Sequence, residues 1–190
     1  MRTDKDLIEN ILAGQTDCFA EIIQKYQRLV SHIVFRMIPG SADREDICQE
    51  IFLLVYQHLS TFKFESKLST WIGRIAYNHC LNFLAKKKIP LWEDLLAEDQ
   101  FIETPSATDH SPEERLSRQD QSERLQHEIE QLPPPWRTIL TLYHGDELKY
   151  HEISRIMGMP EGTVKSYLFR ARKLLKERLT AKYRLEELSV

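Results

Sequence analysis

Hydrophobic residues recur at intervals of three and four along most of the chain, which is the spacing of one face of an α-helix. In the first half of the sequence this pattern predicts four helices. Their apolar stripes span residues 7–12, 19–37, 47–59 and 72–84. Pro39 and Gly40 end the second stripe, and residues 61–67 break the period as a loop. The short connections between these helices indicate one compact all-helical domain over residues 1–90.

Capping residues mark the places where three helices are expected to begin. Residues 41–43 offer serine and aspartate side chains before the third helix, and Ser69 and Thr70 offer hydroxyls before the fourth. Farther along, Ser111 and Glu114 form the two ends of a capping box, with a proline in the first turn. We therefore expect another helix to start at Ser111.

Residues 91–111 hold many acidic side chains and little periodicity, so we interpret them as a flexible linker. A second helical domain is expected over residues 112–190. Its first apolar seam consists of Leu125, Ile129 and Leu132. A proline triplet at 133–135 interrupts that seam, and another periodic stretch follows up to Gly145. The expected fold is therefore all-α, with two small helical domains joined by an acidic linker.

Residues 149–175 have the layout of a helix-turn-helix. A short helix ends at Gly158, which suits the left-handed conformation that follows many helices. The buried stripe of the second helix is predicted at Val164, Leu168, Ala171 and Leu175. Its opposite face presents Lys165, Ser166, Phe169, Arg170 and Lys173. Such a face can enter a DNA major groove, although a generic helical hairpin has the same outline.

The net charge of −3 conceals three zones of different sign. Residues 1–90 carry 12 Lys and Arg against 10 Asp and Glu, residues 91–130 carry 3 against 12, and residues 131–190 carry 11 against 7. Eight of these last bases lie between Thr163 and Arg184. A basic helix of this kind favours a nucleic-acid partner, and a solvated charged face is the alternative.

Several classes of protein are disfavoured by the composition. No apolar run reaches the ~20 residues that span a bilayer, and the polar start of the chain is unlike a signal peptide, so we expect a cytoplasmic protein. Cys18, Cys48 and Cys80 lie far apart without a CxxC pair, which favours free, buried thiols. We expect neither a metal site nor a cofactor site, and no nucleophile–base pair suggests a hydrolase.

Four segments of the second half resemble region 4 of the extracytoplasmic-function (ECF) sigma factors, the group 4 members of the bacterial sigma-70 family. They read LPPPWR at 132–137, YHEISRIMG at 150–158, EGTVKS at 161–166 and RARKLL at 170–175. Upstream, DICQEIF at 46–52 resembles region 2.2, and STWIGRIAYN at 69–78 resembles regions 2.3 and 2.4. The segments follow the order of the family and show no extra domain between them, as in its minimal two-domain group.

The resemblance implies a dissociable subunit of bacterial RNA polymerase that is not an enzyme by itself. Its first domain would open the promoter and read the −10 element, and its second would read the −35 element. The implied partners are core RNA polymerase, promoter DNA and an anti-sigma factor, and the polymerase would be contacted at its clamp coiled-coil and its flap. Neither membrane insertion nor a cofactor is implied.

In the first domain, the resemblance assigns two sets of residues. The clamp coiled-coil would be contacted by Asp46, Gln49, Glu50 and Leu53. These lie opposite an apolar stripe, and spacing alone leaves a solvated face as the alternative. The −10 contacts would be Phe62, Phe64, Lys67, Trp71, Arg74, Tyr77, Asn78 and Asn82. Rings, cations and amides together suit unstacked bases. Trp71 fits the core equally well, and either Phe62 or Phe64 packs inward while the other faces DNA.

In the second domain, the −35 contacts would be Lys165, Ser166, Tyr167, Phe169, Arg170 and Lys173. Two positions depart from the family pattern. Tyr167 stands where arginine is common, and Lys149 stands where a serine commonly caps a helix together with Glu152. We therefore expect Glu152 to lose its capping partner. Two alternatives, packing inside the domain and contact with the polymerase flap, stay open for Ile139, Leu140 and Leu142.

A self-sufficient helix-turn-helix regulator is the main alternative function. Such a protein needs a dimer interface and a sensor, and residues 1–90 show neither a ligand pocket nor a phosphoacceptor pattern. The two functions differ in a gel-shift experiment, because a regulator binds duplex DNA alone and a sigma factor needs core polymerase.

Overall fold

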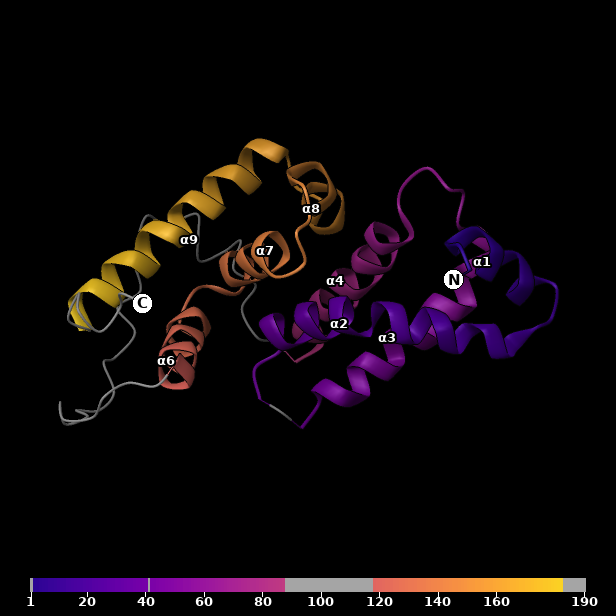
Figure 1. Ribbon diagram of the computed structural model, residues 1–190, viewed down its shortest axis with the longest axis horizontal. Helices are drawn as coiled ribbons and strands as arrows, with labels where there is room; N and C mark the ends of the chain where they lie inside the picture. Colours follow the sequence, from indigo (N-terminus) through magenta and orange to yellow (C-terminus); the bar gives the residue numbers. More distant parts are fainter. Residues whose placement is uncertain (1, 41, 88–117, 183–190) are drawn as a thin grey trace.

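The computed structural model describes residues 2–40, 42–87 and 118–182, and the regular elements in these ranges are all helices (Figure 1). The first half forms α1 (Asp4–Leu12), α2 (Phe19–Met37), α3 (Arg44–His58) and α4 (Leu68–Lys86), with short 3-10 turns at Thr16–Cys18 and Leu59–Thr61. The second half forms α6 (Arg118–Glu130), α7 (Pro134–His144), α8 (Tyr150–Met157) and α9 (Glu161–Lys182). The all-α prediction is confirmed. The expected linker and the helix start at Ser111 lie outside the described residues.

The helix α2 is the centre of the amino-terminal half, since α1, α3 and α4 all pack against it. Its apolar stripe matches the predicted one. The fully buried members are Ile22, Val30, Ile33 and Val34. From α4, the side chains of Ile72, Ala76, Cys80 and Leu84 complete this core. Burial of these apolar surfaces supplies about 25 cal/mol per Å², which is what holds helices that would be marginal in isolation.

The predicted cap region 41–43 does precede α3, but the predicted start of α4 is shifted, and neither helix is capped by the expected side chain. The helix α4 begins at Leu68, so Ser69 and Thr70 lie within its first turn instead of capping it. Leu68 is 2% exposed, and its burial in the core brings the helix start forward. Asp43 does flank α3, but its carboxylate accepts a hydrogen bond from Lys87 Nζ at 2.7 Å and caps no amide of α3.

The helix-turn-helix predicted over residues 149–175 is formed by α8 and α9. Gly158 has a φ of +68°, the left-handed conformation expected for it. Across the turn, Ser154 Oγ donates a hydrogen bond to the Met159 carbonyl at 2.6 Å. The stripe of α9 is buried at Val164, Leu168 and Ala171 and half-buried at Leu175. The turn and the stripe together fix the angle at which α9 is held.

The start of α8 keeps half of its capping box, so the expected loss at Glu152 is limited to one of its two hydrogen bonds. The Lys149 amide donates to the Glu152 carboxylate at 2.9 Å, and only the reciprocal bond, which an ammonium group cannot accept, is missing. Lys67 from the amino-terminal half adds an ion pair to Glu152 at 2.8 Å. Burial alone would raise the pKa of Glu152, but the hydrogen bonds from Lys67 and Lys149 outweigh it and hold that pKa below its ordinary value.

The helix α6 is joined to α9 by a buried ion pair that the sequence pattern did not predict. Ile129 and Leu132 are buried as expected, whereas Leu125 is exposed, so the predicted seam is only partly correct. Between them the fully buried carboxylate of Glu128 accepts a hydrogen bond from Lys182 Nζ at 2.8 Å. A buried carboxylate requires such a partner, and this pair therefore holds the carboxyl-terminal end of α9 against α6.

Two helix pairs, α2 with α7 and α4 with α8, join the halves of the molecule (Figure 1). The helices α4 and α8 approach each other closely at Gly73 of α4. A Cβ placed there would lie 2.8 Å from Ile156 Cδ1 and 3.0 Å from Ile156 Cγ1, so the absence of a side chain lets α8 reach the α4 backbone. Ile156 itself is fully buried by this contact and by its own domain.

Polar side chains of α2 surround the contact with α7 and the loop that follows it. Arg28 donates to the Gly145 carbonyl at 2.9 Å, and His32 Nδ1 lies 2.8 Å from the Asp146 carboxylate. One turn later, Arg36 Nε donates to Thr141 Oγ1 at 3.0 Å. These three side chains follow one another at intervals of four residues, so they lie on one face of α2.

The guanidinium of Arg137 closes the same interface from α7. It donates to the carbonyl of Arg36 at the end of α2 and to the carbonyl of Glu130 at the end of α6. Burial, together with repulsion from Arg36, lowers the pKa of Arg137 to about 10. The group remains charged at neutral pH, and its two carbonyl acceptors belong to helix ends, where cations are favoured.

We predict that Gly73→Val separates the two halves, because its side chain would occupy the space that Ile156 fills. Small-angle X-ray scattering should show a larger radius of gyration, and the helix content by circular dichroism should stay unchanged. Gly162→Val is the matched control, since nothing lies within 4 Å of a Cβ at Gly162. An unchanged radius of gyration in Gly73→Val would show that α8 accommodates the valine without leaving α4.

Candidate nucleic-acid and polymerase interfaces

The polar face of α3 is exposed. It carries the four residues predicted to contact polymerase, Asp46, Gln49, Glu50 and Leu53. Leu53 is 61% exposed, and Tyr56 extends the surface one turn later, packed edge-on against Phe19 with 5.0 Å between ring centroids. The three-residue spacing from Leu53 is the sequence signal that marks Tyr56, which the predicted set lacks. Two exposed apolar side chains among carboxylates and amides suit a basic protein partner.

The loop before α4 and the first turn of α4 place three aromatic rings together. Phe62 is 8% exposed, and its ring centroid lies 4.8 Å from that of Phe64 and 5.3 Å from that of Trp71. Phe64 is 51% exposed and has a φ of +58°, a conformation that non-glycine residues seldom adopt. Of the two orders left open by the sequence, the structure adopts the one in which Phe62 packs inward and Phe64 faces solvent. The ring of Trp71 is half-buried, so its exposure is intermediate between those of the two phenylalanines.

Two cations predicted for the −10 strand are engaged by the second half of the molecule. Lys67 Nζ lies 2.8 Å from Glu152 Oε1, and Arg74 Nη1 donates to the Arg155 carbonyl at 3.4 Å. In return, Arg155 Nη1 donates to the Glu65 carbonyl at 3.4 Å. The helix α8 therefore contacts the loop before α4 and the first turns of α4.

The remaining predicted residues of α4 divide between the surface and the interior. Asn78 and Asn82 are exposed, as expected of side chains that reach base edges. Tyr77 is only 4% exposed, so its predicted outward position is wrong in this arrangement. It follows Gly73 by one helical turn and lies on the side of α4 that α8 approaches, a contact that the period of α4 alone does not reveal.

The outward face of α9 is exposed to solvent. Its exposed members are Lys165, Ser166, Phe169, Arg170 and Lys173. Phe169 is 69% exposed, the largest value among the exposed hydrophobic residues. Tyr167 is half-buried and leans toward α7, with its ring centroid 6.2 Å from that of Trp136. Tyr167, which the resemblance assigned to the −35 contacts, therefore lies at the edge of the buried stripe next to Leu168 and not on the outward face.

The three α7 residues for which two alternatives stayed open all pack inside the fold. Ile139 and Leu142 are fully buried and Leu140 is 8% exposed. The helix α7, which carries these residues, is in direct contact with α9. The interior alternative is the one that this structure adopts.

The cysteines are free thiols, buried at Cys18 and Cys80 and half-buried at Cys48. Burial raises the pKa of Cys48, and it raises that of Cys80 to about 12, so neither thiol ionises near neutral pH.

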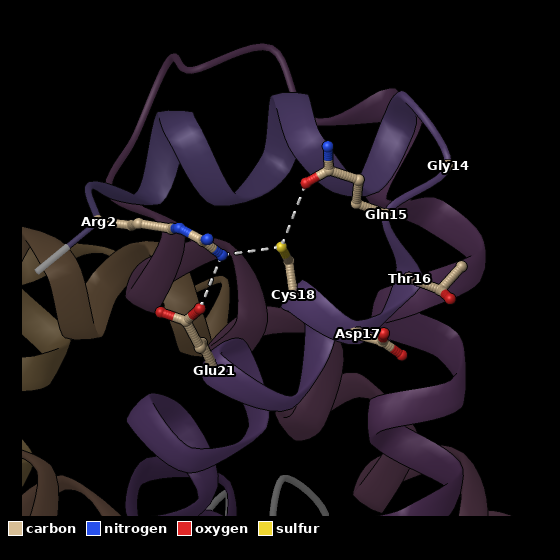
Figure 2. Close-up of a pocket in the computed structure, with 7 residues that line it drawn as sticks. All are labelled: Arg2, Gly14, Gln15, Thr16, Asp17, Cys18 and Glu21. Carbon is tan, nitrogen blue, oxygen red and sulfur yellow. Dashed lines mark hydrogen bonds and ion pairs between the residues drawn. The ribbon is translucent and has the colours of Figure 1, made fainter.

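Figure 2 shows an open polar pocket beside Cys18, where Arg2 donates to the sulfur and to Glu21, both at 3.0 Å. Within the described ranges, no group of three or more His, Cys, Asp or Glu is placed to hold a metal ion.

Comparisons with known proteins match both halves of the chain. Residues 22–89 match the family "Sigma-70 region 2", and residues 122–175 match "Sigma-70, region 4". The chain is 34% identical over 180 residues to the RNA polymerase sigma-H factor of Pseudomonas aeruginosa, covering 93% of both proteins. It is 32% identical over 183 residues to the ECF RNA polymerase sigma factor SigW of Bacillus subtilis, covering 92% of this chain and 96% of that one. The chain belongs to the ECF sigma factors of the sigma-70 family.

A solved structure supports the fold of this sigma factor. The structure of RpoE in complex with the anti-sigma factor NepR from Bartonella quintana aligns with a TM-score of 0.62 at 19% identity, over 87% of this chain and 98% of that one. The region 2 match contains α3, the aromatic loop and α4, and the region 4 match contains the helix-turn-helix. None of the described helices combines the length and the apolar character that a bilayer span requires.

The positions of the two phenylalanines predict a large loss of stability for one alanine variant and a small change for the other. Phe62→Ala removes a buried ring and should lower the free energy of unfolding by roughly 3–5 kcal/mol. Phe64→Ala removes an exposed ring at a strained backbone position and should change it by no more than ~1 kcal/mol. Urea unfolding of both variants, followed by circular dichroism, measures the difference. Equal losses would mean that Phe64 belongs to the core.

Proposed function

We propose that this sigma factor directs RNA polymerase to promoters through two separate reading surfaces. The region 2 domain, residues 1–90, binds core polymerase and the −10 element, and the region 4 domain, residues 112–190, binds the −35 duplex. The observation that carries the proposal is the outward face of α9, which presents lysine, arginine, serine and an exposed Phe169 on one rigid helix. Cations and polar groups reach phosphates and guanine edges, and an aromatic ring contacts a thymine methyl group.

The aromatic loop and α4 serve the melted strand of the −10 element. Phe64 and Trp71 each lie against the ring of Phe62 and offer a stacking surface, and Asn78 and Asn82 present amides along the exposed side of α4. Bases that leave a duplex are held by stacking on rings and by hydrogen bonds to their edges. A protein that hydrolyses no nucleotide draws the cost of strand opening from this binding, so capture of an unstacked base by Phe64 favours the open promoter.

The exposed surface of α3 binds the clamp coiled-coil of core polymerase. Glu50 and Asp46 supply negative charge beside the exposed Leu53 and Tyr56, a combination that fits a basic helix with apolar residues. The structure of the Bartonella sigma factor contains an anti-sigma factor, which supports a protein partner of that kind here too. The sigma factor contributes binding and positioning, and the chemistry of RNA synthesis belongs to the polymerase.

In the closed arrangement described above, α4 contacts α8 and α2 contacts α7. This arrangement is that of the free protein, and promoter binding requires the two halves to separate. Elements named −10 and −35 lie about 25 base pairs apart, which is roughly 85 Å of duplex at ~3.4 Å per base pair. Helices in direct contact cannot reach both. Separation also releases Lys67 from Glu152 and Arg74 from Arg155, so both cations become available for the −10 strand.

We predict that Lys165→Ala and Arg170→Ala weaken −35 recognition and leave core binding intact. Each lost contact should cost roughly 1–3 kcal/mol of promoter affinity, because both side chains lie on the exposed face of α9. Promoter occupancy by the reconstituted holoenzyme measures the loss, and co-purification with core polymerase is the control. Unchanged occupancy in both variants would contradict the assignment of α9.

A gel shift without core polymerase tests the alternative of a stand-alone regulator, which would bind the duplex by itself.

We predict that Phe64→Ala and Asn78→Ala impair strand opening more than formation of the closed complex. Each removes an exposed group proposed to hold an unstacked base, and neither removes a buried side chain. Permanganate reactivity of unpaired thymines should fall, while protection of the duplex upstream persists. Normal reactivity in both variants would show that these side chains serve only the structure.

A further inference from the structure

Cations and aromatic rings from three helices form a continuous cluster beside the outward face of α9. Tyr143 of α7 and Tyr150 of α8 are stacked, with 5.1 Å between ring centroids and 18° between ring planes. Lys165 Nζ lies 5.4 Å from the Tyr150 centroid, and Arg172 Cζ lies 5.1 Å from the Tyr143 centroid. We call these four side chains the tyrosine ladder. Both cations are within the distance at which a ring face attracts a positive charge.

The lower end of the tyrosine ladder is fixed by His144. The Arg172 guanidinium approaches His144 Nε2 at 2.9 Å, and arginine can only donate, so the imidazole nitrogen accepts. Burial, and then the charge of Arg172, lower the pKa of His144, which keeps the ring neutral and able to accept. The ring of His144 also packs edge-on against Tyr143 at 5.0 Å. Arg172 is therefore oriented by a ring face and by a hydrogen bond at once.

The upper end holds a lysine that belongs to the proposed −35 surface. Lys165 is exposed, and a lysine in that position ordinarily samples many rotamers. Its attraction to the Tyr150 ring limits that freedom before DNA arrives, while the other side of the ammonium group faces solvent. A hydrogen bond with Tyr143 raises the pKa of Tyr150 above its ordinary value, and the Tyr150 hydroxyl is neutral at neutral pH. A binding group held in place in this way loses less entropy on binding.

We infer that Tyr150, supported by Tyr143, is a positioning residue for the −35 duplex that orients Lys165, and that Arg172 is a second, unpredicted cation for the DNA backbone. The inference rests on the proposed function of α9. Lys165 and Arg172 are seven residues apart, which is two helical turns or about 10.5 Å along the axis, so they form a pair on one edge of α9. The stacked tyrosines lie behind both cations and keep their spacing.

A double-mutant cycle tests the positioning role. The variants are Tyr150→Leu, Lys165→Ala and the double mutant, each as the full chain reconstituted with core polymerase. A promoter fragment is first identified by run-off transcription of genomic fragments. The Kd of each holoenzyme for that fragment is then measured. Tyr150→Leu alone should weaken binding roughly two- to fivefold, the size expected of one exposed cation–π contact. In the Lys165→Ala background it should add nothing, because no ammonium group remains to be positioned. Tyr150→Phe, which keeps the ring, should retain most of the affinity.

Matched variants separate positioning from packing. Tyr167→Leu makes the same change at a half-buried ring that packs on Trp136, so its effect should be the same with and without Lys165. Arg172→Ala should reduce the dependence of log Kd on log salt concentration by about one unit, as for one lost phosphate contact. Equal effects of Tyr150→Leu in both backgrounds, or an unchanged salt dependence in Arg172→Ala, would overturn the inference. If Lys165→Ala alone leaves the affinity unchanged, the positioning role fails, whereas the proposed −35 surface fails only if Arg170→Ala also leaves it unchanged.

Discussion

The approach of α8 to α4 at Gly73 is the contact on which the arrangement of this molecule depends. A glycine inside a helix costs stability relative to alanine, and here the missing side chain is what allows Ile156 to reach the α4 backbone. The polar contacts of α2 with α7 and the loop that follows it act around this apolar centre. They set the register of the halves, since each pairs a side chain of α2 with one particular acceptor.

The contact between α4 and α8 pairs side chains of one proposed DNA-binding surface and leaves the other exposed. Lys67 and Arg74, the cations proposed to contact the −10 element, are paired with α8, whereas the outward face of α9 is left exposed. Electrostatic contacts at a partly exposed interface are worth little individually and are weakened by salt. They are therefore suited to an interface that must part, and a stronger ligand for the same cations, such as a nucleic-acid strand, competes with them directly.

The amino-acid sequence determined the helices and most of their faces. The period of apolar residues is a local property, so the stripe of α2, the turn at Gly158 and the buried side of α9 follow from it directly. The polar face of α3 and the exposed face of α9 follow for the same reason, because they are the complements of those stripes. The order of the motifs identified the ECF sigma-factor resemblance, which the comparisons confirm.

Tertiary structure alone decided what happens where two helices from distant parts of the chain meet. Tyr77 lies off the apolar stripe of α4 but is buried on the side that α8 approaches, and Glu152 finds Lys67 from the other half of the molecule. The pattern of one helix records only whether a side is apolar, and it carries no information on which partner covers that side. The choice of Phe62 over Phe64 for the interior, the tyrosine ladder and the closed arrangement all depend on such distant contacts.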